Sequence, residues 1–501
     1  MKQQTAHNQN ARGNSWIAAL KFVPLLVFAL LVIVVKLDLL LAAPIAVFTA
    51  AVVYMLTCHC SFEEAFQQGL NSVKNIVLIF FILMFAYAVA ESFMATGVGA
   101  SLICIALKLG ITARTIAPVS ILVTCVLSVA TGSSWGTFAA CAPIFLWLNH
   151  LVGGDLLLTT CAIAGGSCFG DNIGMISDVT VLSCGMQDVK IIDRVRHQLV
   201  WSLLCLLLSV FIFYFAGHSL PSIPGDPAAA ISKIPESAYA ALSVEKPAAL
   251  LLLEQVKNGV PLYLVIPLFV IIILSFTGFH TLLCMLAGVL SSLVLGLIAG
   301  TTDVSTFFRV VVMTGFTDAG AWVIVMMLWV AAFGGIMNAM GAFDPLAKVV
   351  VKISRNVPQL MGWCGMLCLV GNMALADEAA QVATMSPIVR DIVEKNVETD
   401  SEEDAYLLRV RLATYTSSMG IYGSELVPWH CFPVFFAKIS SMVYPLHEFT
   451  TLEIISRNYM SFLVIGSILF LSFTGLDRLI PGFALPKTAR LKKHASGKVE
   501  A

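Results

Sequence analysis

Charged side chains are scarce in this sequence. Only 12% of its 501 residues are Asp, Glu, Lys or Arg, whereas soluble globular proteins contain about 25%. Hydrophobic residues make up 58% of the chain, and the mean hydropathy is +0.90. Because no compact soluble fold could bury so much apolar surface, we exclude a soluble enzyme, a secreted disulfide scaffold and a nucleic-acid-binding protein. The composition predicts a polytopic integral membrane protein.

The motifs of metal and nucleotide chemistry are also missing. Cys58-His59-Cys60 is the only dense Cys/His cluster, and no second Cys/His pair follows it at the spacing of a zinc site. Most other cysteines lie singly in apolar runs, where a thiol acts as a small hydrophobic group. No phosphate-binding loop of the form G-x-x-x-x-G-K-[ST] is present. We therefore expect no cofactor, no resident metal and no ATP-driven step.

Apolar stretches recur along the chain, and many are long enough to cross a hydrocarbon layer of roughly 30 Å. They predict an all-α fold with about 10–12 transmembrane helices, some of them broken or re-entrant. The first stretch lacks a signal-cleavage pattern, so we expect it to remain as the first span. The expected spans are residues 16–36, 38–57, 75–94, 99–130, 138–152, 156–185, 199–217, 260–277, 279–300, 321–341, 358–376, 378–395, 408–445 and 459–475.

A long polar interruption at residues 218–259 divides the chain into two comparable hydrophobic halves. Its five prolines disfavour a continuous helix. Two such halves are typical of transporters built from inverted-topology repeats. We predict an N-terminal tail (1–15), a first transmembrane repeat (16–217), an extramembrane linker (218–259), a second transmembrane repeat (260–475) and a basic C-terminal tail (476–501).

The placement of basic residues predicts the orientation, because they concentrate in cytoplasmic loops. The C-terminal tail is rich in lysine and arginine, and two loops of the chain are also basic. We therefore expect both termini to lie in the cytoplasm and the protein to lie in the cell (inner) membrane. The basic residues are Lys487, Arg490, Lys492, Lys493 and Lys498 in the tail, and Lys190, Arg194, Arg196, Lys348, Lys352 and Arg355 in the loops.

Two aspartates interrupt the hydrophobic first half. Asp171 and Asp178 lie in a segment that also contains four glycines, between residues 165 and 178. A carboxylate at mid-membrane costs roughly 2.5–3.5 kcal/mol, so such groups are functional by default. The glycines indicate a helix break, where free carbonyls and the carboxylates could surround a cation. The structural alternative is a kinked helix whose carboxylates are paired with a donor.

A second polar run lies upstream, at residues 131–137, within a region that has no charge from Thr115 to Gly154. Six of its seven residues are glycines or small hydroxyl residues. Such a run is typical of a re-entrant tip or unwound helix that lines a cavity. It is equally typical of tight helix packing through small residues.

The second half repeats this pattern. Gly371 and Asn372 precede Asp377-Glu378 after an uncharged stretch, and Glu425 is the only charged residue between Arg411 and Lys438. Gly132 and Gly371 are separated by roughly 240 residues, as are Asp178 and Glu425, which is the offset expected of a duplicated architecture. Paired breaks in corresponding positions of the two halves predict a binding site near the bilayer midplane.

These motifs resemble those of the NhaC-type sodium/proton antiporter family. Residues 131–137 are similar to its G-T-S-W-G-T element, and residues 170–180 to its G-D-x-x-S-P-L-S-D-T-T element. Ala376-Asp377-Glu378 falls where the family's A-D-Q-Y motif is expected, and residues 424–429 resemble its S-P-L-I-P-W element. The resemblance spans roughly residues 20–475, with the motifs in the same order.

The resemblance implies that Asp171 and Asp178 bind the coupling cation or proton and that the serine and threonine elements line the site. The sequence departs from the pattern at Met175-Ile176, which replaces Ser-Pro, and at Glu425, which stands where proline is usual. These departures leave the transported species open. The expected ion- and substrate-binding residues are Gly132, Ser133, Ser134, Thr137, Asp171, Asn172, Ser177, Asp178, Thr180, Asn372, Asp377, Glu378, Ser424 and Glu425.

We expect a secondary active transporter that exchanges sodium or lithium for protons by alternating access, with buried carboxylates binding either cation. The alternative is ion-coupled exchange of a small organic solute, such as a carboxylate or amino acid. No basic residue is evident near the breaks, which favours cations. An intramembrane aspartyl protease would need two aspartates, but Cys168 stands where its G-x-G-D motif needs glycine.

A passive channel fits duplicated breaks less well than alternating access does. The expected partners are sodium ions, protons and the lipid bilayer, with the organic solute as the alternative. A homodimer is among the assemblies that we consider. We interpret His430 as a structural histidine, because satisfied histidines are common in helical interiors.

Overall fold

The computed structural model is almost entirely helical. It describes residues 16–492 except residues 18, 76, 176, 223–230, 233, 235–242, 244–246 and 278. The two β-strands within this part of the chain, β1 and β2, have two residues each and pair antiparallel. The N-terminal tail, nearly half of the linker, and Lys493 and Lys498 of the C-terminal tail lie outside the described residues.

The first half runs from α2 to α11. Its elements are α2 (Val23–Ala29), the π-helix η1 (Leu30–Val34), α3 (Leu39–Cys58), α4 (Phe62–Asn75), α5 (Val77–Thr96), α6 (Val98–Lys108), α7 (Ile116–Thr131), α8 (Ser134–Val152), α9 (Leu156–Ile173), α10 (Asp178–Gln187) and α11 (Ile191–Ala216). Within the linker, α14 (Pro247–Asn258) is described.

The second half begins with η2 (Leu262–Val265) and α15 (Ile266–Phe276), and it ends with β2 (Arg490–Leu491). Between them lie α16 (Thr281–Ala299), α17 (Val304–Thr306), η3 (Phe307–Val312), α18 (Met313–Asp318), η4 (Ala319–Val323), α19 (Ile324–Ala339), α20 (Asp344–Ile353), α21 (Val357–Leu375), α22 (Glu378–Asn396), β1 (Val397–Glu398), α23 (Glu402–Ser424), α24 (Cys431–Val443), α25 (Thr451–Ser456), α26 (Tyr459–Thr474) and η5 (Leu476–Leu479).

Six described helices or continuous helical runs are long and apolar enough to cross a membrane, and the bent pair α5–α6 would make a seventh. Five further apolar helices are shorter. These helices confirm an all-α polytopic membrane protein. The total of 10–12 crossings, the domain boundaries and the inverted-repeat relationship stay predictions.

Three of the longest expected spans are divided by breaks. The expected span 99–130 is split into α6 and α7, the span 156–185 into α9 and α10, and the span 408–445 into α23 and α24. Each was too long for a plain crossing of the hydrocarbon layer, because a helix rises only about 1.5 Å per residue. The breaks expected near Asp171 and Glu425 are therefore confirmed.

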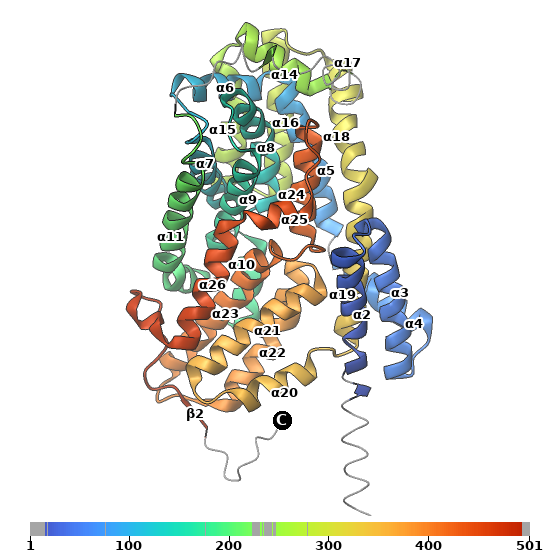
Figure 1. Cartoon of the computed structure of the whole chain (residues 1–501), viewed down its shortest axis with the longest axis vertical. Coiled ribbons are helices and arrows are strands. Elements are labelled where there is room, and N and C mark those ends of the chain that lie inside the picture. The colour runs from blue at the N-terminus through green and yellow to red at the C-terminus, as the bar shows by residue number, and fades with distance from the viewer. Residues whose placement is uncertain are drawn as a thin grey trace, which may run out of the picture.

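The helices of the two halves are interleaved in space (Figure 1). The amino-terminal helices α3 and α4 pack against α19 of the second half, whereas α7 and α9 form a close pair beside α11 and α26. The linker helix α14 lies at one end of the molecule, and α20 and β2 lie at the other. The breaks in α7–α8, α9–α10, α21–α22 and α23–α24 lie between these ends.

Two glycines bring α7 and α9 together. A Cβ atom at Gly170 would lie 2.1 Å from the backbone of Ser128 and Val129, and one at Gly166 would lie 2.5 Å from the carbonyl oxygen of Ile121. Only glycine permits such a close approach of two helix backbones. The glycines at 166 and 170 therefore serve helix packing inside α9, and only Gly174 belongs to the break itself.

Candidate functional site

The break between α7 and α8 has a specific backbone conformation. Gly132 ends α7 in the left-handed region, with φ +65°, and Ser133 then adopts an extended conformation as the N-cap of α8. Gly136 N donates a hydrogen bond of 3.3 Å to Ser133 Oγ, as expected for a serine N-cap. This geometry leaves Ser134 and Trp135 in the first turn of α8, at the tip of the break.

The break between α21 and α22 repeats this conformation. Ala376 ends α21 with φ +55°, and Asp377 is the extended N-cap of α22, accepting a 2.7 Å hydrogen bond from Ala380 N. From the sequence we expected this break at Gly371, which is wrong. Gly371 lies within α21, where a Cβ atom would lie 2.6 Å from Met385. The two corresponding turns are thus Gly132-Ser133 and Ala376-Asp377.

Asp171 joins the two breaks of the first half. It lies in the last turn of α9 and is only 5% exposed. Its Oδ2 accepts hydrogen bonds from Ser134 Oγ at 2.7 Å and Ser134 N at 3.2 Å, and its Oδ1 accepts one from Ser177 Oγ at 2.5 Å. Both carboxylate oxygens are therefore bonded to groups at the starts of α8 and α10.

The second-half breaks are joined by hydrogen bonds, most of them to backbone carbonyl oxygens. Cys431 N, at the start of α24, donates to the carbonyl oxygen of Ala376 at 3.4 Å, and Trp429 Nε1 donates to that of Met373 at 2.7 Å. Asn372 lies one turn before the end of α21, and its Nδ2 donates to the carbonyl oxygens of Met419 and Gly420 and to Ser424 Oγ. The ends of α21 and α23 are thereby held together.

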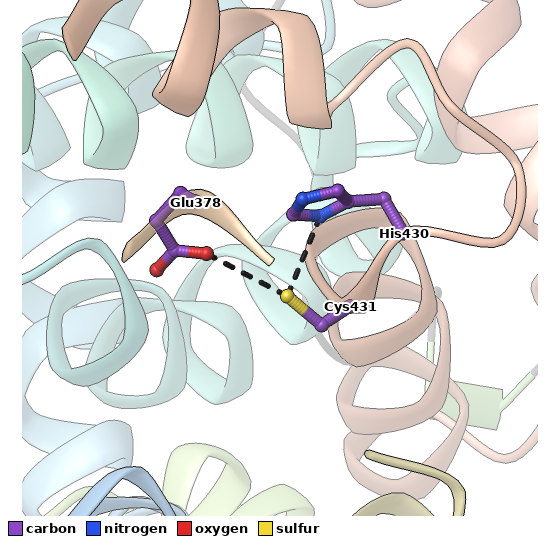
Figure 2. Close-up of side chains that lie close together, drawn as sticks. All are labelled: Glu378, His430 and Cys431. Carbon is purple, nitrogen blue, oxygen red and sulfur yellow. Dashed lines mark hydrogen bonds between the residues drawn. The ribbon is translucent and has the colours of Figure 1, made fainter. Parts of the chain in front are cut away.

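Trp135 and Glu378 connect the two halves. Trp135 Nε1 donates to Glu378 Oε1 at 3.4 Å, and the indole ring stacks on Phe432 with ring centroids 4.8 Å apart. Glu378 Oε2 in turn lies 3.6 Å from Cys431 Sγ (Figure 2). Because Asp171 contacts Ser134 and Glu378 contacts the adjacent Trp135, the acids of both halves lie around the tip of α8.

Asn172 provides a second connection between the halves. Its Oδ1 accepts hydrogen bonds from Ser417 and Ser418 of α23, at 3.3 and 3.2 Å, and from Arg194 Nη2 at 3.1 Å. The carbonyl oxygen of Asn172 also accepts from Arg194 and Gln198. The end of α9 is thus bonded to both α11 and α23.

Arg194 contradicts two expectations from the sequence. It is fully buried in α11 and not in a basic loop, and it lies beside the α9–α10 break, where no basic residue was expected. Its guanidinium donates to Thr180 Oγ1 at 2.9 Å, to both oxygens of Asn172 and to Gln198 Oε1. A basic residue at the edge of a polar run, next to Asp193, offered no signal that it turned inward.

The acids at the start of α22 have unfilled hydrogen-bonding capacity. Asp377 and Glu378 are each 3% exposed, and Asp377 Oδ2 has no hydrogen-bond partner among the described residues. Gln381, one turn further along α22, is also buried, and its Oε1 likewise has no partner in the described part of the chain. Gln381 was not among the site residues expected from the sequence, although its i, i+4 spacing from Asp377 was a usable signal.

No described lysine, arginine or histidine forms an ion pair with Asp171, Asp377 or Glu378. Ionised carboxylates that are buried without a cation are energetically costly. A proton or a metal ion bound to these oxygens would neutralise them. The arrangement can therefore bind a hard cation through carboxylate and amide oxygens, or protons on the same carboxylates.

The expected site residues do not all lie together. Asp178 is exposed at the start of α10, whereas the sequence analysis expected two buried aspartates. Thr137 faces an apolar cavity that Met285 also lines. Glu425 accepts a hydrogen bond from Asn458 at the start of α26. The residues at the joined breaks are Gly132, Ser133, Ser134, Asp171, Asn172, Ser177, Thr180, Asn372, Asp377, Glu378 and Ser424.

Comparison with known proteins identifies the family. A model of the Na+/H+ antiporter family matches residues 8–217 and 166–474, which together cover most of the chain. The chain belongs to the Na+/H+ antiporter family. This membership points to a transporter and not an enzyme, and it confirms the resemblance drawn from the motifs.

Curated relatives agree with this family. The Na+/H+ antiporter NhaC of Bacillus subtilis is 24% identical over 347 residues, which cover 64% of this chain and 72% of the relative. NhaC of Alkalihalophilus pseudofirmus is 24% identical over 308 residues, covering 58% and 62%. The malate-2H+/Na+-lactate antiporter of B. subtilis is 21% identical over 435 residues, covering 82% and 84%. The family and the two NhaC relatives support sodium/proton antiport.

Proposed function

We propose that this member of the Na+/H+ antiporter family exchanges sodium or lithium ions for protons at the joined helix breaks. The observation that carries the proposal is the set of buried acids at the joined breaks: Asp171 and Glu378, which contact the tip of α8, and the adjacent Asp377, all without a described cationic partner. Helix breaks supply both unpaired backbone groups and side-chain oxygens at membrane depth, as an ion site requires.

In this mechanism Glu378 and Asp377 bind either a sodium ion or protons. The partnerless oxygens Asp377 Oδ2 and Gln381 Oε1 would become ligands, because sodium ions prefer oxygen ligands. Either occupant neutralises the carboxylates, so the two cations compete for one site. Exchange follows when the occupied site becomes accessible from alternate sides of the membrane.

Asp171 positions the helix ends and is not assigned to binding the exchanged cation. Its hydrogen bonds with Ser134 and Ser177 hold the starts of α8 and α10 against the end of α9, so that Trp135 meets Glu378. Asp178 is exposed at the start of α10, and we assign it to the approach by which cations reach the buried acids. Its negative charge would raise the local cation concentration there.

We further propose that the protein lies in the cell membrane with both termini in the cytoplasm. The remaining basic residues of the C-terminal region support this orientation, as does the position of α14 at the end opposite β2. Arg194 no longer counts toward it, because it is buried. A homodimer stays a prediction.

Purified protein in liposomes that contain a pH-sensitive dye would test the activity. With a pH gradient imposed, we expect sodium or lithium to trigger proton movement and potassium to trigger none. If none of the three ions triggers proton movement, the proposal is wrong. If amino acids or carboxylates alone trigger proton movement, the chain exchanges an organic solute. Both terminal nitrogens of Arg194 are already hydrogen-bonded within the protein and only its Nε has no described partner, which argues against bidentate binding of an organic anion.

A further inference from the structure

Three side chains with metal-ligating atoms converge where α24 meets α22 (Figure 2). Cys431 Sγ lies 3.6 Å from Glu378 Oε2 and 3.4 Å from His430 Nδ1, and one ligand atom from each residue lies within 4.8 Å of the others. All three side chains are buried. Among the described residues, no other group of three or more His, Cys, Asp and Glu side chains gathers in this way.

The hydrogen bonds around His430 define its tautomer. Asn372 Nδ2 donates to three acceptors, which identifies Oδ1 as the acceptor end of this amide. Because that Oδ1 lies 3.1 Å from His430 Nε2, the nitrogen must carry the proton. Nδ1 of the neutral ring therefore presents a lone pair toward Cys431 Sγ. An outer partner that fixes the ring in this way is typical of histidine metal ligands.

A single thiol hydrogen lies between the ligand atoms of the cluster. His430 Nδ1 accepts the backbone N–H of Phe432 at 3.3 Å as the N-cap of α24, and with Glu378 ionised the thiol supplies the only hydrogen between Sγ and the other two atoms. One S–H can donate to only one of the two acceptors that face it. A divalent cation would accept electron pairs from all three atoms at once.

The separations suit a tetrahedral ion. Zinc binds sulfur at about 2.3 Å and nitrogen or oxygen at about 2.0–2.1 Å, so two such ligands at a tetrahedral angle lie about 3.5 Å apart. The observed distances of 3.6 Å and 3.4 Å from Cys431 Sγ match this spacing. Three protein ligands would leave the fourth position to water.

We propose that Glu378, His430 and Cys431 form a site for a borderline-soft divalent cation such as Zn2+ or Cd2+, and that its occupation blocks exchange. Mixed thiolate, imidazole and carboxylate ligands select such ions over sodium. The block rests on the proposed function, because a metal-bound Glu378 can no longer exchange sodium ions for protons. Binding itself does not depend on that function.

Binding of Cd2+ can be measured directly by the ultraviolet charge-transfer absorption of the cadmium–thiolate bond. The full-length protein in detergent would carry Cys58→Ser and Cys60→Ser, which remove the two competing thiols near the loop between α3 and α4. We expect one equivalent of Cd2+ per chain. Cys431→Ser should weaken binding by more than about 100-fold, since even outer partners of metal ligands contribute 10–100-fold. The matched control is Cys141→Ser, another buried thiol, on α8.

The second measurement adds Cd2+ or Zn2+ to the exchange assay in liposomes. We expect inhibition of the protein that contains Cys431 and none of the Cys431→Ser variant. Cadmium absorption that is unchanged by Cys431→Ser, or equally reduced by Cys141→Ser, would overturn the site. If the absorption depends on Cys431 but the metal does not inhibit exchange, the proposal that the bound metal blocks exchange is wrong. If the protein binds Cd2+ but exchanges no sodium, the proposed function fails while the metal site stands.

Discussion

Asp171 of the first half accepts hydrogen bonds on both carboxylate oxygens, whereas Asp377 of the second half has one oxygen without a partner in the described residues. Both acids lie at helix breaks, and the turns Gly132-Ser133 and Ala376-Asp377 have nearly the same backbone conformation. The halves therefore use similar breaks with different side chains: hydroxyls at the start of α8, and carboxylates at the start of α22.

Two glycines in the helices that end at these breaks differ in what lies opposite them. Gly170 of α9 faces the backbone of α7, which cannot move aside, while Gly423 of α23 faces the side-chain ends of Leu369 and Asn372. Backbone contact fixes the distance between helices, whereas side chains can change rotamer. We infer that the contact between α7 and α9 supplies a rigid framework and that the acids at the start of α22 are the groups that change occupant.

Glu378→Gln should have the largest effect on exchange. Glutamine keeps the size of the side chain and an oxygen that can accept from Trp135, but it cannot bind or release a proton. We expect sodium-driven proton movement to fall at least about 100-fold, which is the lower range for loss of a proton-transfer group. The dye assay measures this, and Glu394→Gln on the exposed side of α22 is the control. Normal exchange by Glu378→Gln would assign the function to the other acids.

Asp171→Asn should have a smaller effect of a different kind. A neutral amide weakens the charge-assisted hydrogen bonds with Ser134 and Ser177, which are roughly twice as strong as neutral ones. We expect exchange to fall about tenfold and the thermal midpoint to fall with it, since a lost buried hydrogen bond costs about 1–3 kcal/mol. Glu378→Gln should leave the midpoint nearly unchanged. If the midpoints respond in the opposite order, the division between framework and exchanging half is wrong.

Much of the fold could be predicted from hydropathy, because spans of apolar residues end where the chain must leave the hydrocarbon layer. The acids and glycines at residues 165–178 indicated a break in the correct place. Gly371 was misleading because a glycine inside a helix can serve packing, and Ala376 adopts the left-handed turn instead. Arg194 and Cys431 could not be placed from spacing alone, because their contacts come from helices that are distant in sequence.

Gly170→Ala tests the framework directly. Its Cβ atom would lie 2.1 Å from backbone atoms of α7, so the two helices must separate. We expect a loss of about 1–3 kcal/mol in the free energy of unfolding, as for other overpacked interiors. Gly423→Ala should cost less, and Gly185→Ala, where nothing lies within 4 Å, should cost nothing. Thermal unfolding in detergent measures all three, and equal losses at positions 170 and 423 would contradict the comparison.

Asp178→Asn should have the smallest effect, and it separates the structural interpretation from that of the sequence alone. The sequence predicts that this change abolishes exchange, because Asp178 was expected to be buried beside Asp171. Its exposure at the start of α10 instead predicts a two- to fivefold rise in the sodium concentration for half-maximal rate, with the maximal rate retained. Raised salt should reduce the difference between variant and parent, since exposed charges are screened. Complete loss of exchange would place Asp178 among the groups that bind the transported ion.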